Sequence, residues 1–98
     1  MARDMGNLAV LYEERGELDR AESLYRESLA IAERYEGSAA ASIAATKYAN
    51  LGDIALARGR QREARSLWKQ AAELFRQVGD ERYHAAVQAK VAAASEPG

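Results

Sequence analysis

The 98-residue chain has no cysteine, one histidine (His84) and one proline (Pro97). Without cysteine it can form no disulfide, no thiolate metal site and no cysteine nucleophile. A single histidine argues against a histidine-based metal centre and against a catalytic triad. The formal net charge is −1. A dedicated nucleic-acid binder needs a surplus of basic residues to neutralise phosphates, so that class is not expected.

No stretch of the sequence approaches the ~20 apolar residues of a membrane-spanning helix. Met1 leads straight into Ala2 and Arg3, which is not the start of a secretory signal peptide. The sequence also has no glycine-rich phosphate loop and no pair of carboxylates placed for acid–base work. We therefore expect a single cytoplasmic domain over residues 1–98 that is not an enzyme, has no catalytic or metal site, no cofactor and no membrane contact.

The residues that are abundant favour helices. Alanine, leucine, glutamate and arginine are strong helix formers, and no segment alternates apolar and polar residues as a strand would. Glycines separate segments with helical periodicity, which predicts five helices at about 2–15, 18–35, 39–58, 61–78 and 81–94. Ser38 and Asp80 are expected to be N-caps. The connections are short, so consecutive helices should be antiparallel neighbours.

The sequence matches itself at a shift of 43 residues. The identical pairs are Asn7 with Asn50, Leu8 with Leu51, Arg15 with Arg58, Gly16 with Gly59, Ala21 with Ala64, Ser23 with Ser66 and Leu24 with Leu67. The same shift pairs Tyr25 with Trp68 and Lys47 with Lys90. A repeat of this period in a helical sequence predicts a solenoid of helix pairs.

Two segments carry a family pattern. The first reads Met5-x-x-Leu8-Ala9-x-x-Tyr12, then Gly16 and Ala21-x-x-x-Tyr25, and the second Tyr48-x-x-Leu51-Gly52-x-x-Ala55, then Gly59 and Ala64-x-x-x-Trp68. The pattern resembles the tetratricopeptide repeat, and the long period resembles the subclass found in kinesin light chains and bacterial signalling proteins. The resemblance implies an all-α, right-handed solenoid with repeats over 2–36 and 38–79, a C-terminal capping helix or half repeat over 80–94, and a tail over 95–98.

The pattern also predicts how each helix pair packs. Small residues, Ala9 and Gly52, should let the first helix of each pair approach the second closely. Tyr25 and Trp68 should then fill the space toward the next repeat, which places Trp68 between the fourth and fifth helices. The aromatic residues could alternatively form a platform on which bases stack, but their helical spacing favours core packing.

The resemblance implies a function as well: an interaction module that binds a peptide or helical segment of a protein partner in a concave groove, as a fragment of a larger repeat protein. Asn7 and Asn50 should face that groove, since an amide can both donate to and accept from a peptide backbone. An asparagine bonded within its own repeat is the alternative. Residues one turn away would line the same surface: Arg3, Val10, Glu14, Thr46, Asp53 and Ala57.

A basic cluster follows the third helix and comprises Arg58, Arg60, Arg62, Arg65 and Lys69. It could hold phosphate, nucleic acid or an acidic partner. The alternative, which we favour, is a solvated helix face, because Glu63 lies among these residues. Charge is divided unevenly along the chain, with −4 over residues 1–37 and +3 over residues 38–98.

Self-association is a second expected function. The first predicted helix has no counterpart of residues 38–43, so its face should be uncovered. Apolar residues surround that face: Leu8, Leu11, Leu24 and Ile31. A two-fold homodimer or a head-to-tail stack could bury them, and the opposite charges of the two halves would support either contact.

Overall fold

Helices joined by short turns account for nearly all of the computed structural model, which describes the backbone of residues 2–95 and the side chains of residues 8–94. Over that range the helices are α1 (Ala2–Glu14), α2 (Leu18–Ala32), α3 (Ser38–Ala57), α4 (Gln61–Gln77) and α5 (Glu81–Ser95). Residues 2–95 contain no strand. The all-α prediction is confirmed, and each predicted boundary lies within a residue of the observed one, except at the end of α2.

Two local predictions were wrong. The second helix ends at Ala32 and not at residue 35, because the Tyr35 N–H bonds back only three residues to the Ala32 carbonyl, at 3.1 Å. Gly37 and not Ser38 is the N-cap of α3. Its φ of 107° is one that glycine adopts without strain, and Ser38 is already helical. The Asp80 cap is confirmed, since its carboxylate accepts from the Tyr83 N–H at 3.2 Å.

The backbone conformation of the turns repeats at the same shift of 43 residues. Gly16 and Gly59 have φ angles of 80° and 76°, the left-handed conformation that ends a helix. The residue after each glycine closes the same bond: Glu17 N–H to the Tyr12 carbonyl and Arg60 N–H to the Ala55 carbonyl, both at 2.8 Å. The α1–α2 and α3–α4 hairpins are therefore equivalent units.

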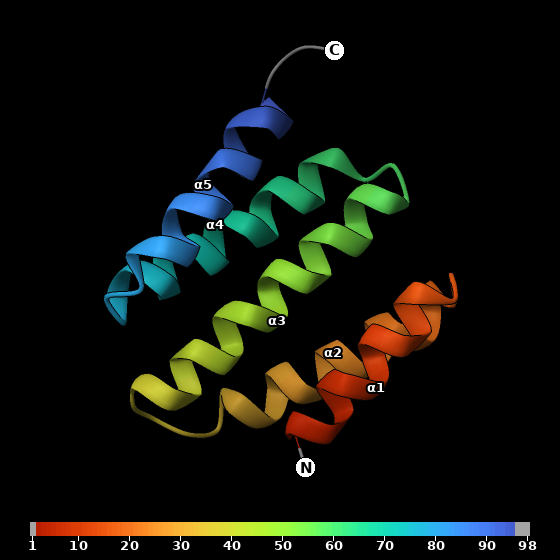
Figure 1. Cartoon of the computed structure of the whole chain (residues 1–98), viewed down its shortest axis with the longest axis horizontal. Helices are drawn as coiled ribbons and strands as arrows, with labels where there is room; N and C mark the ends of the chain where they lie inside the picture. Colours follow the sequence, from red (N-terminus) through yellow and green to blue (C-terminus); the bar gives the residue numbers. More distant parts are fainter. Residues whose placement is uncertain (1, 96–98) are drawn as a thin grey trace.

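The helices form two layers (Figure 1). α1, α3 and α5 lie on the near side of that view, and α2 and α4 lie behind them. Each helix packs against its neighbours in the chain, so that α3 lies between α2 and α4 while α1 packs against α2. This is the expected helix-pair solenoid, with two hairpins and α5 covering the second.

Small residues at the helix contacts make room for the two large aromatic side chains. Ala9, Ala21 and Tyr25 are each fully buried, and Trp68 is 3% exposed. The indole of Trp68 lies directly on Gly52, where an added Cβ would come within 2.4 Å of Nε1. The Trp68 ring thus contacts α3 as well as facing α5, and its position depends on the absence of a side chain at residue 52.

Replacing Trp68 by alanine should lower the free energy of unfolding by roughly 3–5 kcal/mol, because the side chain fills the space between three helices. In a domain of this size that loss can prevent folding at room temperature. Urea denaturation followed by circular dichroism measures it. Tyr35→Ala is the matched control, since that ring is 67% exposed and its loss should change little. An unchanged unfolding midpoint for Trp68→Ala would contradict the packing described above.

Gly52→Ala should also destabilise the protein. Alanine gains up to about 1 kcal/mol over glycine in a helix interior, but overpacking a buried ring costs about 1–3 kcal/mol. The double variant Gly52→Ala/Trp68→Tyr reproduces the alanine–tyrosine pair, Ala9 and Tyr25, of the first hairpin and should regain most of the loss. Thermal unfolding of the three proteins tests this, and a Gly52→Ala variant more stable than the parent would disprove it.

Candidate functional site

A cleft of about 400 Å³ lies between α3 and α5. We call it the α3–α5 cleft. Its lining residues are Ser42, Thr46, Ala49, Asn50 and Asp53 of α3, Phe75 of α4, Asp80 before α5, and Tyr83, Ala86, Val87 and Lys90 of α5. Apolar atoms make up most of the exposed area of this lining, although seven of these eleven residues carry a polar or charged side chain. The cleft therefore offers apolar surface together with several hydrogen-bonding positions.

Three of the residues predicted to line a groove meet in this cleft: Thr46, Asn50 and Asp53. Their spacing along α3 places them on one helix face. Ala57 is exposed at the end of α3 and does not line the cleft. Of the α1 residues, Val10 and Glu14 are exposed, whereas the side chains of Arg3 and Asn7 lie outside the described residues.

Asn50 is the side chain in the cleft that is best suited to bind a peptide backbone. It is half-buried, and its amide makes no hydrogen bond to any of the described side chains or backbone groups. Thr46 differs, because its hydroxyl donates to the Ser42 carbonyl of its own helix at 3.0 Å. An amide at the edge of an apolar cleft has both a donor and an acceptor to offer.

An ion pair joins the two walls of the cleft. Lys90 Nζ of α5 lies 2.8 Å from Asp53 Oδ1 of α3, and the same oxygen accepts from the Trp68 indole N–H at 3.2 Å. The Lys90 ammonium also lies 5.7 Å from the centre of the Trp68 ring, which is the geometry of a cation–π contact. These contacts fix the position of the Asp53 carboxylate and link α3, α4 and α5.

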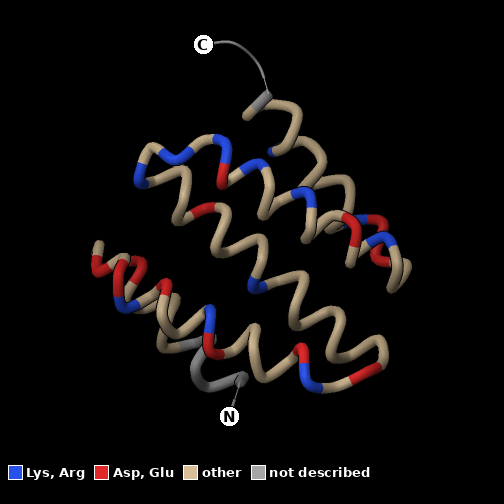
Figure 2. The backbone as a smooth tube through the Cα atoms, turned by 180° about the vertical axis from the view of Figure 1, so that it is seen from behind, with Lys and Arg blue, Asp and Glu red and all other residues tan. Residues whose placement is uncertain are grey.

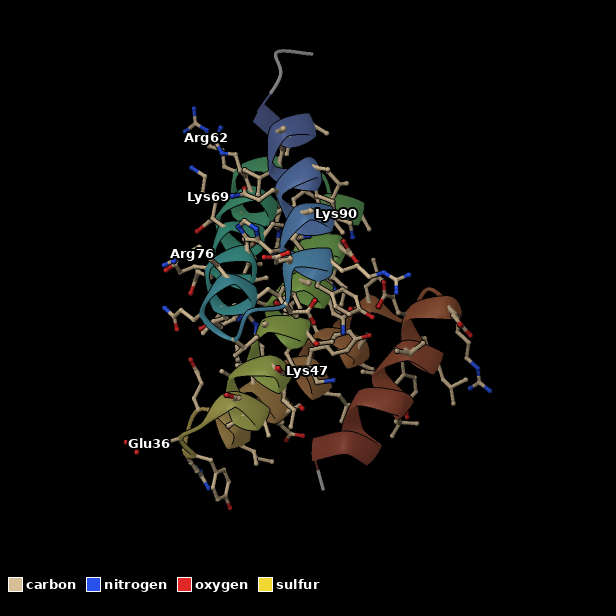
Figure 3. All side chains as sticks on the ribbon, turned by 60° about the vertical axis from the view of Figure 1, so that its left-hand side comes forward. Glu36, Lys47, Arg62, Lys69, Arg76 and Lys90 are labelled. Carbon is tan, nitrogen blue, oxygen red and sulfur yellow. The ribbon has the colours of Figure 1, made fainter. Side chains whose placement is uncertain are left out.

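Sequence reasoning had not placed Lys90 in the site, although the repeat carried a signal for it. The shift of 43 residues pairs Lys90 with Lys47 and Trp68 with Tyr25. Lys47 Nζ lies 5.7 Å from the Tyr25 ring centre, so the second helix of each hairpin makes the same aromatic–lysine contact with the helix that follows it. Figure 3 labels the two lysines. Burial lowers the pKa of Lys47.

Tyr83 was also missed as a site residue. It is 57% exposed, whereas Val87 and Val91 on the same helix are buried. Its ring stacks on Phe75 with 5.3 Å between centres and 21° between planes. Tyr83 and Phe75 thereby form an aromatic wall of the cleft, which only the packing of α5 on α4 could reveal.

Two other tyrosines have structural partners. The Tyr25 hydroxyl donates to Glu13 at 3.0 Å, and the Tyr48 hydroxyl donates to Glu33 at 3.0 Å. Burial first, and the neighbouring carboxylate second, raise the pKa of both hydroxyls. These groups stay protonated and tie α1 to α2 and α2 to α3.

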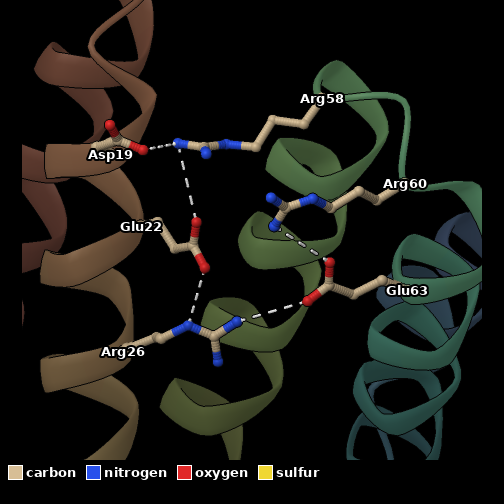
Figure 4. A network of polar contacts seen from close by, with 6 residues as sticks. All are labelled: Asp19, Glu22, Arg26, Arg58, Arg60 and Glu63. Carbon is tan, nitrogen blue, oxygen red and sulfur yellow. Dashed lines mark hydrogen bonds and ion pairs between the residues drawn. The ribbon is translucent and has the colours of Figure 1, made fainter.

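The predicted basic cluster is partly neutralised. Basic residues gather around the α3–α4 turn and along α4 (Figure 2). Arg58 pairs with Asp19 at 2.5 Å and with Glu22 at 3.9 Å, while Arg60 pairs with Glu63 at 3.7 Å (Figure 4).

Arg26 extends this network. It lies 3.0 Å from Glu22 and 3.8 Å from Glu63, so that ion pairs run from α2 to α4. Arg62 and Lys69 extend outward from α4 (Figure 3). Within the basic cluster, Arg58 and Arg60 thus take part in ion pairs, whereas Arg62 and Lys69 extend outward. This division favours the interpretation of the cluster as a solvated helix face.

The tetratricopeptide repeat family model matches the chain twice, over residues 5–39 and 44–78. The chain belongs to the tetratricopeptide repeat family. Proteins of this family are non-catalytic repeat scaffolds that generally mediate contacts between proteins. A search of curated proteins gave no match. The described part of this tetratricopeptide chain has no helix long and apolar enough to cross a membrane. Among residues 8–94, no cluster of three or more histidine, aspartate or glutamate side chains is placed to hold a metal ion.

The ion pair between Asp19 of α2 and Arg58 at the end of α3 should make the free energy of unfolding depend on pH. The hydrogen bond from Arg58 lowers the pKa of Asp19 below its ordinary value of 3.8. A lowered carboxyl pKa contributes stability above the unfolded-state pKa, and this contribution is lost as the pH falls through the folded-state value. The Asp19 side chain is 92% exposed, so solvent screens the pair and its contribution is small. Asp19→Asn should therefore lower the melting temperature at pH 7 by a few degrees at most and converge with the parent near pH 2. Melting curves across that range measure the difference, and a constant offset at every pH would contradict it.

Proposed function

We propose that the protein binds an extended peptide segment of a partner protein in the α3–α5 cleft. The observation that carries the proposal is the half-buried Asn50 amide, which has no hydrogen bond within the described residues and lies beside apolar surface. The amide would bond to the peptide backbone. Apolar peptide side chains would pack mainly against Tyr83 and Ala86, which are the exposed apolar residues of the cleft lining.

The ion pair between Asp53 and Lys90 supports this site by making it rigid. Trp68 holds one oxygen of Asp53, and Lys90 is held by both the carboxylate and the indole ring. A cleft whose walls are already in place loses little conformational entropy when a ligand binds. The same ion pair lowers the free charge in the cleft, which favours a mainly apolar peptide over a strongly charged one.

The long period of the repeat supports a place in the long-period subclass. The 43-residue shift relates the turns, the lysine–aromatic contacts and the two asparagines. In that subclass the asparagine of the first helix in each pair tends to face the bound peptide, and we assign Asn50 this role. Phosphate or nucleic-acid binding by the basic cluster is less favoured, because Arg58 and Arg60 already pair with carboxylates.

Asn50→Ala should weaken peptide binding by about 1 kcal/mol or more while leaving the fold intact, because one hydrogen-bond partner of the peptide backbone is lost. The full chain can be screened against a displayed library of random 12-residue peptides, and the selected peptides measured by fluorescence anisotropy. Circular dichroism checks that the variant is folded.

Gln70→Ala is the matched control, since it removes an exposed amide from α4, away from the cleft. It should bind the selected peptides as the parent does. Amide chemical shifts should change around Asn50 and Tyr83. Changes centred on the exposed residues Ser23 and Ser66 of α2 and α4 would show that the cleft is not the binding site.

A further inference from the structure

The outer face of α1 differs sharply from the equivalent face of α3. Leu8 and Leu11 correspond, at the 43-residue shift, to Leu51 and Ile54. The α3 residues are each 2% exposed, whereas Leu8 is 43% and Leu11 52% exposed. Leucine side chains that the repeat elsewhere buries are therefore open on α1.

The covering helix accounts for the difference. α3 is packed on one side by its own hairpin partner α4 and on the other by α2, whereas α1 is packed by its hairpin partner α2. The turns after α1 and α3 have the same glycine conformation and the same closing hydrogen bond. The exposed face of α1 is thus the surface on which a helix equivalent to α2 would lie.

The α2–α3 contact also shows which charges such a helix should carry. Arg58, at the end of α3, pairs with Asp19 and Glu22 in the first turns of α2 (Figure 4). Its equivalent at the end of α1 is Arg15, which is exposed. A helix placed antiparallel on α1 would bring its first turns to Arg15, where carboxylates are favourable.

We propose that Leu8, Leu11 and Arg15 form a docking surface for an amphipathic helix of a partner protein. That helix lies antiparallel to α1, presents an apolar stripe to the two leucines and carries carboxylates in its first two turns next to Arg15. This surface is separate from the α3–α5 cleft and does not depend on the function proposed for it.

A second copy of this chain is a poorer occupant. The helices of the required type, α2 and α4, are each packed by two neighbouring helices already. At the positions of Asp19 and Glu22, α4 carries Arg62 and Arg65, which would place like charge opposite Arg15. A partner helix with the chemistry of α2 avoids both problems.

A peptide with the sequence of residues 17–34, which spans α2, is the probe. Its binding to the isotope-labelled full chain should shift the amide signals of Leu8, Leu11 and Arg15. Leu11→Lys should weaken binding about tenfold, since it replaces an apolar contact with a charge that must lose its water at the interface. Leu56→Lys, which changes a leucine of α3 that is 49% exposed, should leave binding unchanged, and so should Asn50→Ala.

The charge contact has its own test. A peptide with lysine at both Asp19 and Glu22 should bind the parent about two- to fivefold more weakly, and Arg15→Glu in the protein should restore that peptide's affinity. No shift on α1, or shifts confined to the buried residues Ala9 and Ala21, would overturn the proposal. So would a dimer of the full chain in sedimentation that Leu11→Lys converts to monomer, because a second copy would then occupy the surface.

Discussion

The packing of the Trp68 indole on Gly52 is the contact on which the rest of the second hairpin depends. A bare glycine lets the indole lie against the α3 backbone, and the indole N–H then reaches both the Ala49 carbonyl and the Asp53 carboxylate. Asp53, held in this way, pairs with Lys90 of α5. A packing constraint in the core thus sets the distance between the walls of the cleft, and the candidate site is a consequence of the core and not an addition to it.

The two hairpins share a scaffold but differ at the positions that give each surface its chemistry. Lys47 and Lys90 make the same contact with Tyr25 and Trp68. The residue equivalent to Asp53 is Val10, however, so the ion pair that braces the α3–α5 cleft has no counterpart at that position of α1. The two hairpins therefore have similar backbones, and a difference at a single position, Asp53 against Val10, gives one an ion-paired cleft and the other an exposed apolar helix face.

Much of the candidate site could be predicted, and the parts that could not have a common cause. Thr46, Asn50 and Asp53 follow from helical periodicity, because residues three and four apart share a face. Tyr83 and Phe75 come from different helices, and whether Tyr83 enters the core or lines a cleft depends on the rotation of α5 against α4. Lys90 could have been found by carrying the Lys47–Tyr25 pair through the shift, but only if that pair was known to be in contact.

The sequence by itself determined the helices, their approximate ends, the repeat and the small residues at the helix contacts, because these depend on local propensity and on periodic spacing. The tertiary structure decided which charges are paired, which leucines are open and where the cleft lies. Arg15 and Arg58 are equivalent at the 43-residue shift, and each directly precedes the glycine of its turn. Arg58 is paired and Arg15 is exposed, since α3 has a helix of the preceding hairpin beside it and α1 packs mainly on its own hairpin partner. Such differences depend on which helices pack against each other, and a local sequence pattern does not determine this.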